Sequence, residues 1–191
     1  MSPPDLTEKQ LSTQTVYQGG LLHVKEDLVQ LPDGRTARRE YILHPGAVVI
    51  IPLLTDGSVV MERQFRYPLH RDLYELPAGK LDAGESVLAC GQRELLEETG
   101  YRAASWKYVA EIHPCIGYSN ERICLYLAQD LSGGKHRRDG DEFLEVFVLP
   151  LPEALEWVRT GRITDAKTVI GLFWAEKILN GWLPPETQNP D

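Results

Sequence analysis

Several features that would assign this chain of 191 residues to a familiar class are absent from it. It has only three cysteines, and no C-x-x-C spacing, which argues against a disulfide framework and against a zinc site. No apolar run approaches the roughly 20 residues that a membrane-spanning helix needs. The first residues contain neither the basic nor the apolar segment of a secretory signal. We therefore expect a cytoplasmic protein that does not associate with membranes.

Positive charge is also scarce in this chain. It has 20 Lys and Arg residues against 28 Asp and Glu residues, a formal net charge of −8. Nucleic-acid-binding proteins normally present a clustered basic face, so we expect no nucleic-acid partner. If the substrate were a phosphate anhydride, bound divalent cations and a few placed arginines would be needed to bring anion and protein together.

The pattern along the chain predicts an α+β protein with one main domain. We expect an N-terminal β extension at residues 1–43, frayed over 1–12, a main domain at 44–184 and a disordered tail at 185–191. Pro32-Asp33-Gly34 is a strong hairpin signal, and such a hairpin must pack on a domain or on a partner chain. Strands are expected near residues 14–17, 21–31, 36–43, 47–54, 58–67, 72–76, 105–113, 121–129 and 143–149, and helices near 86–99, 152–159 and 165–179.

The most informative segment covers residues 79–101, GKLDAGESVLACGQRELLEETGY. Glu94 and Glu98 lie four residues apart, so on a helix both carboxylates project from one face, with Glu97 beside them. Carboxylate oxygens are hard ligands that suit Mg²⁺ or Mn²⁺. Arg93 is a single guanidinium among the glutamates of this segment and cannot neutralise them alone. The alternative is a surface helix with a solvated acidic face.

This segment resembles the Nudix box, the loop-helix-loop signature of Nudix hydrolases. All seven fixed positions of that signature are present: Gly79, Glu85, Arg93, Glu94, Glu97, Glu98 and Gly100. Tyr101 departs from the pattern, because an aliphatic residue is usual there. The flanking glycines and the matching offsets favour function over a solvated acidic face. The resemblance implies a mixed β-sheet between helices, an α/β/α sandwich, here with an N-terminal antiparallel β-sheet extension.

Three further stretches resemble the branch of this superfamily that hydrolyses ADP-ribose and nucleoside-diphosphate sugars. They are residues 63–67 followed by 73–79, residues 140–146, and residues 161–168. Pro114 also suits that branch, although its neighbours depart from the commoner Ser-Pro-Gly. The resemblance implies a pyrophosphatase that uses two to three Mg²⁺ ions, or Mn²⁺. A metal-activated water would attack phosphorus, giving a nucleoside monophosphate and a sugar phosphate without a covalent enzyme intermediate.

The same resemblance assigns the metal ligands. It implies that the carbonyl of Ala78 and the carboxylates of Glu94 and Glu98 hold metal. Glu97 is a further ligand or is held by Arg93. Both Glu97 and Glu98 are therefore candidate catalytic residues.

A distal glutamate completes the site in relatives, and Glu142 occupies that place in this chain. It would bind metal or orient the attacking water, and a solvated loop acid is the alternative. Asp139, Asp141 and Glu145 are nearby fallbacks for the same role.

Other motif positions are expected to be structural or to bind substrate. Glu85 and Arg93 would form a pair that pins the loop onto the helix, and the two box glycines, Gly79 and Gly100, would shape the segment. For substrate binding, the same resemblance implies Arg66 on the diphosphate, Glu75 on the terminal sugar, and Arg38 and Arg39 from the N-terminal sheet.

Relatives in this branch are dimers whose N-terminal strands swap onto the partner, so we expect a homodimer. Two other functions remain open: a Nudix enzyme acting on nucleoside triphosphates or dinucleotides, and a domain that senses ADP-ribose without hydrolysing it. The sequence leaves undecided which sugar is preferred, which phosphorus is attacked, how many metals bind and which acid is the base.

Overall fold

The computed structural model describes residues 3–133 and 143–182. The chain divides into two compact units. The N-terminal unit comprises residues 1–45 and 115–122, and the larger unit comprises residues 46–114 and 123–191. In the part of the chain that the structure describes, no helix is long and apolar enough to cross a membrane.

The N-terminal unit is built on an antiparallel sheet of three strands. They are β1 (Lys9–Gln18), β2 (His23–Gln30) and β3 (Thr36–Ile42), in the order β1-β2-β3. The predicted hairpin turn joins β2 to β3, and Gly34 takes a φ of 87° that favours glycine. The expectation that residues 1–12 fray is wrong for residues 9–12, because β1 begins at Lys9, opposite Gln30. Pairing with β2 orders this polar segment despite its composition.

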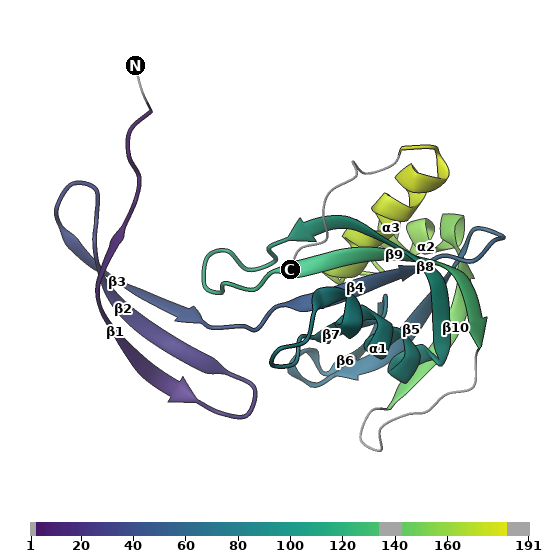
Figure 1. Ribbon diagram of the computed structural model, residues 1–191, viewed down its shortest axis with the longest axis horizontal. Helices are drawn as coiled ribbons and strands as arrows, with labels where there is room; N and C mark the ends of the chain where they lie inside the picture. The colour runs from purple at the N-terminus through teal and green to yellow at the C-terminus, as the bar shows by residue number, and fades with distance from the viewer. Residues whose placement is uncertain (1–2, 134–142, 183–191) are drawn as a thin grey trace. The chain divides into compact units, whose positions relative to one another are not determined.

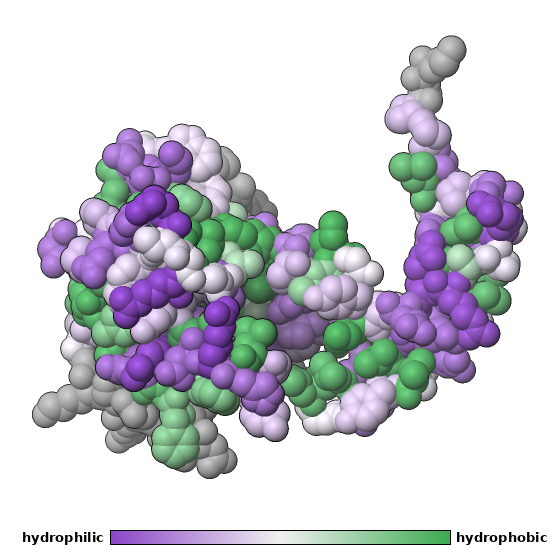
Figure 2. Space-filling model, turned by 180° about the vertical axis from the view of Figure 1, so that it is seen from behind, coloured by the Kyte–Doolittle hydropathy of each residue, from purple (hydrophilic) through white to green (hydrophobic). Residues whose placement is uncertain are grey.

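This sheet buries few of its side chains within a single chain. Every residue of β1 is exposed, and the hydrophobic side chains of the unit interrupt its polar surface (Figure 2). The exposed apolar residues of these strands and their first turn are Leu11, Val16, Tyr17, Leu21, Leu22 and Leu28. Residues 115–122 add backbone support, since the Ile42 N–H donates to the Tyr118 carbonyl at 2.8 Å. A single sheet can bury its apolar side chains only if another layer packs on it.

The larger unit contains two sheets within the described residues. The first is mixed, in the order β7-β4-β9-β8, with β4 parallel to β9 and the other neighbours antiparallel. Its strands are β4 (Ala47–Pro52), β7 (Ala78–Lys80), β8 (Tyr101–Ile112) and β9 (Ile123–Gly133). The second sheet is antiparallel and consists of β5 (Ser58–Arg66), β6 (Arg71–Glu75) and β10 (Leu144–Pro150), with a 3₁₀ turn at Tyr67–Leu69 between β5 and β6.

Helices cover both faces of the mixed sheet (Figure 1). They are α1 (Val87–Thr99), α2 (Leu151–Arg159) and α3 (Ala166–Leu179). Alternation along β4 divides the core, because successive side chains of a strand point to opposite faces. Val48 and Ile50 pack in the cluster that contains α1 residues, whereas Val49 and Ile51 pack in the cluster that contains residues of α2 and α3. The predicted α+β class and α/β/α sandwich are confirmed.

Local capping chemistry determines where the helices begin and end. The Ser86 side chain caps α1 by accepting from the Ala89 N–H at 3.3 Å. Gly100 ends the helix in the left-handed region, with a φ of 74°, and its N–H donates to the Leu96 carbonyl. Asp165 caps α3 in the same manner as Ser86 caps α1.

Strand β7 is the element that sequence reasoning missed. The Pro77-Ala78-Gly79 sequence is typical of a turn, but Ala78 pairs with Val49 and Gly79 with Val48. Pairing with β4 therefore holds this short strand extended beside α1, where it contributes to the site.

Candidate active site

Strand β7 and helix α1 bring two of the predicted site glutamates to one place. The Ala78 N–H donates to Glu98 Oε2 at 3.0 Å, and Glu98 is buried. A Cβ atom added to Gly79 would lie 1.8 Å from Glu94 Oε1 and 1.9 Å from its Cδ. Any larger residue at this position would therefore displace the Glu94 side chain. Both carboxylates end beside the same short strand.

Arg93 binds three of the four glutamates of the segment. Its Nε and Nη2 donate to the two carboxylate oxygens of Glu85, each at 2.9 Å. Its Nη1 donates to Glu94 at 2.7 Å and to Glu97 at 3.2 Å. The hydrogen bond from Arg93 lowers the pKa of Glu85 to about 2, and the same bond raises the pKa of Arg93. The expected Glu85–Arg93 pair is present, though it is partly rather than fully buried.

The donor set at this place suits a hard cation, but the carboxylates are not gathered around a common point. Within residues 3–133 and 143–182, no group of three or more His, Cys, Asp or Glu side chains could hold a metal ion as placed. Glu94 and Glu97 share Arg93 instead, and Glu98 accepts from the strand. All donors are carboxylate or carbonyl oxygens, which fit Mg²⁺ or Mn²⁺. Because Gly79 has no side chain, the Glu94 carboxylate lies against the backbone of β7.

The predicted distal acid, Glu142, lies outside the described residues, as do Asp139 and Asp141. The remaining fallback, Glu145, lies on β10 and forms an ion pair with Arg63, with 2.7 Å between Nη2 and Oε2.

A second cluster surrounds the predicted diphosphate-binding residue Arg66 at the end of β5. Its Nε and Nη2 donate to Glu75 Oε1 and Oε2 at 2.6 and 2.8 Å. The hydrogen bond to Glu75 raises the pKa of Arg66, and the charges of Glu62 and Glu98 add to this effect. The guanidinium thus lies in the electrostatic field of a box glutamate.

Lys167, at the start of α3, completes this cluster and was missed as a site residue. Its Nζ binds Glu75 Oε2 and also donates to Asp165 Oδ2 at 2.9 Å. Burial alone would raise the pKa of Glu75, but the hydrogen bonds and charges of Arg66 and Lys167 outweigh burial and lower it. The lysine lay inside the third resembling stretch, residues 161–168, which was the available signal.

Glu62 is another buried acid that sequence reasoning missed. It lies on β5 directly opposite Glu75 of β6, and both residues are only 1% exposed. An acidic residue after the apolar run Val59–Met61 was the signal in the sequence. Two buried carboxylates on paired positions need nearby cations to stay ionised, because isolated buried charge is very costly.

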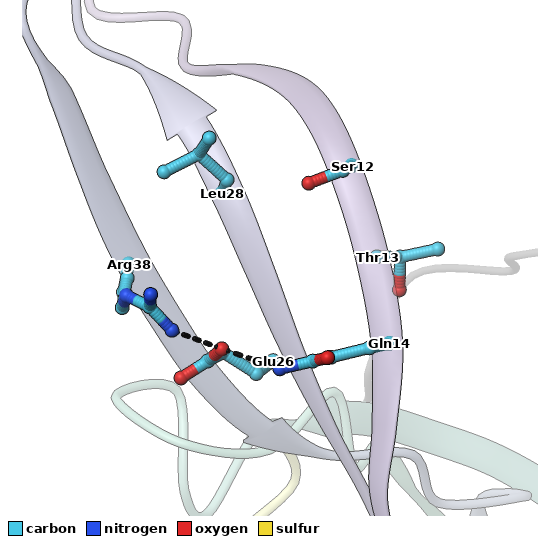
Figure 3. Close-up of a pocket in the computed structure, with 6 residues that line it drawn as sticks. All are labelled: Ser12, Thr13, Gln14, Glu26, Leu28 and Arg38. Carbon is cyan, nitrogen blue, oxygen red and sulfur yellow. Dashed lines mark hydrogen bonds and ion pairs between the residues drawn. The ribbon is translucent and has the colours of Figure 1, made fainter.

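Arg38 and Arg39 belong to the N-terminal unit. Arg38 of β3 pairs with Glu26 of β2, which also accepts from Gln14 Nε2 of β1 at 2.7 Å, so the three side chains form a row across the sheet (Figure 3). This row borders a shallow hollow of about 360 Å³. Arg39 donates to Glu8 at 2.9 and 2.5 Å. The contact of either arginine with substrate stays a prediction.

Comparison with known families identifies the family to which this chain belongs. A family model described as the NUDIX domain matches residues 43–169, about two thirds of the chain. The chain belongs to the Nudix family. A second model, described as the nucleoside diphosphate sugar hydrolase N-terminal domain, matches residues 8–42. The predicted family and its branch are confirmed by this pair of matches, and the protein is a Nudix hydrolase.

Individual relatives align with nearly the whole of this Nudix hydrolase. It is 38% identical over 171 residues to the methanol dehydrogenase activator of Bacillus methanolicus, covering 88% of this chain and 92% of that protein. It is 36% identical over 173 residues to the ADP-ribose pyrophosphatase of Bacillus subtilis (strain 168), covering 90% and 94%. A crystal structure of an ADP compounds hydrolase has the same fold, with a TM-score of 0.82 at 24% identity, covering 93% and 97%.

Proposed function

We propose that this Nudix hydrolase cleaves the pyrophosphate bond of ADP-ribose or a related nucleoside-diphosphate sugar, giving a nucleoside monophosphate and a sugar phosphate. The observation that carries the proposal is the meeting of Glu94 and Glu98 with Ala78 and Gly79, where the box helix meets β7. The two family models and the name of the Bacillus subtilis relative support the substrate class.

The residues that would hold Mg²⁺ or Mn²⁺ are the Ala78 carbonyl, Glu94 and Glu98, with Glu97 and Glu142 as further ligands. When bound, two or three such ions would acidify a water molecule and offset the charge of the diphosphate. Arg93 holds the carboxylates of Glu94 and Glu97 near each other, because its Nη1 donates to both. Glu98 is oriented by the Ala78 N–H, so one of its oxygens is already fixed.

Arg66 would bind the diphosphate. Glu75 occupies the edge formed by its Nε and Nη2, which leaves Nη1 and the second N–H of Nη2 directed away from that pair. This end of a guanidinium matches two phosphate oxygens, and 39% of the Arg66 side chain is exposed. Because both oxygens of Glu75 are engaged in ion pairs, its contact with a terminal sugar stays a prediction.

We also propose that the protein acts as a homodimer. Residues 1–43 would pack on the partner subunit and help to form its active site, and residues 44–184 would form the catalytic domain. The exposed apolar side chains of the N-terminal unit support this proposal, since a sheet buries its apolar face only by packing against another layer. A second chain would supply that layer.

The decisive experiment is a panel of nucleotides with Mg²⁺, with the products separated by chromatography. The panel contains ADP-ribose, ADP-glucose, GDP-mannose, a UDP-sugar, a nucleoside triphosphate and a dinucleotide. We expect cleavage of the diphosphate sugars to a monophosphate, and ¹⁸O-labelled water would show which phosphorus is attacked. Turnover of triphosphates or dinucleotides alone would favour a different Nudix activity. Binding of ADP-ribose without cleavage would instead indicate a sensor.

A further inference from the structure

We infer that Lys167 is a positioning residue for substrate binding, acting through Glu75 on Arg66. This inference rests on the proposed function, because it assumes that Arg66 binds a diphosphate. Glu75 is the link, since its side chain is 2% exposed and it accepts from Arg66 on one side and from Lys167 on the other.

Lys167 is also held by Asp165, the residue that caps the N-terminus of α3. Lys167 Nζ donates to Asp165 Oδ2, which also accepts from the Thr168 N–H at 3.0 Å and from its hydroxyl at 2.6 Å. The Thr168 Oγ1 in turn accepts from the Leu76 N–H at 2.9 Å, immediately after β6. A chain of hydrogen bonds therefore connects the N-terminus of α3 to the strand that carries Glu75. Lys167 has a defined place in this chain, with 14% of its side chain exposed.

Charge balance explains what the lysine contributes. Glu75 is withdrawn from water and cannot be stabilised by solvent, so its charge must be met by neighbouring cations. With Lys167 in place, two cations, Arg66 and Lys167, meet the two carboxylates of Glu75 and Asp165, so Arg66 does not balance the charge of Glu75 alone. Without Lys167, Arg66 would have to neutralise Glu75 alone, while the field of Glu62 also acts on it. The guanidinium would then attract a diphosphate less strongly.

Lys167→Met keeps the length of the side chain and removes the charge. We expect this variant to raise KM for ADP-ribose by about tenfold or more while kcat changes by less than about threefold. Lys167→Arg, which restores the cation, should recover KM to within about threefold of wild type. Lys177→Met is the matched control, because Lys177 lies on the same helix with 61% of its side chain exposed, and it should leave both constants unchanged.

A double-mutant cycle separates positioning from a general structural effect. In an Arg66→Ala background, Lys167→Met should change KM by less than about twofold, because the residue through which it acts is already gone. An unchanged KM in the single variant, or an equal KM increase in both backgrounds, would overturn the inference.

Two further outcomes are distinguishable. If the wild-type protein hydrolyses no nucleoside-diphosphate sugar, the proposed function has failed, whereas wild-type turnover with no effect of Lys167→Met rejects only the inference. Thermal unfolding identifies a variant that does not fold, and Lys167→Gln then replaces Lys167→Met. Failure of both neutral variants to fold would show that the lysine serves the fold instead, which also overturns the inference.

Discussion

Gly79→Ala is the sharpest perturbation of the proposed metal site. The added methyl would lie 1.8 Å from Glu94 Oε1, and real Cβ contacts essentially never fall below 3.0 Å. The carboxylate must therefore retreat by at least about 1.2 Å. Because a displacement of about 1 Å in a catalytic group can cost about 100-fold in rate, we expect a loss of that order in ADP-ribose turnover with Mg²⁺.

The same change should leave the fold nearly intact. Gly79 does not adopt a positive φ, so alanine is compatible with the backbone and stabilises by about 0.4–1 kcal/mol through the unfolded state. Moving Glu94 off its rotamer costs about 0.5–1.5 kcal/mol, and weakening its hydrogen bond from Arg93 adds to that cost. The balance is a destabilisation of about 1–2 kcal/mol, so Tm should fall by no more than about 8 °C.

Gly91→Ala provides the matched control, because Gly91 lies on the buried side of α1. A Cβ there would meet Trp106 Cζ3 and Val48 Cγ2 at 3.4 Å, which is close to ordinary contact. This variant should retain activity within about threefold. The reasoning is refuted if Gly79→Ala keeps wild-type kcat and KM, or if it loses activity only because it unfolds.

Three other predictions concern the box and the N-terminal unit. Glu98→Gln should lower kcat by orders of magnitude while circular dichroism shows an intact fold; near-wild-type turnover would remove Glu98 from the site. Deletion of residues 1–42 should yield a poorly active monomer by light scattering, whereas a fully active truncated monomer would reject the shared site. Because the pKa of Glu85 is lowered from 4.5 to about 2, its pairing with Arg93 stabilises the fold above pH 4.5 and is lost as the pH falls toward 2. Glu85→Gln should therefore cost about 1–2 kcal/mol at pH 7, after allowing for solvent screening, and show a flatter decline of Tm below pH 4.5; an equally steep decline would contradict this account.

Features determined by neighbouring residues could be predicted from the sequence. Helix α1 begins after Ser86, whose side-chain oxygen caps it, and ends at Gly100, which readily adopts a positive φ. Both effects act within one turn of the helix. The turn at Gly34 is equally local. The continuous apolar run of β4 indicated a strand buried on both faces, which the division of its side chains between two core clusters confirms.

Features determined by distant partners could not be predicted. Strand β7 exists because β4 pairs with it, and the first residues of β1 are ordered by β2. The ion pair between Lys167 and Glu75 joins residues 92 positions apart. The family resemblance suggested that Glu75 contacts a sugar, and only the fold, which brings Lys167 of α3 to Glu75 of β6, shows that two cations bind it.

The contacts of Arg93 have a consequence for how the protein behaves when it is depleted of divalent ions. A helix that carries several acids in one stripe would normally repel itself once its metal is chelated. Here the guanidinium already lies between Glu85, Glu94 and Glu97 and offsets that repulsion from within the helix. Under the proposed function, chelating the divalent ions should therefore abolish activity while the folded protein persists, and returning the ions should restore turnover.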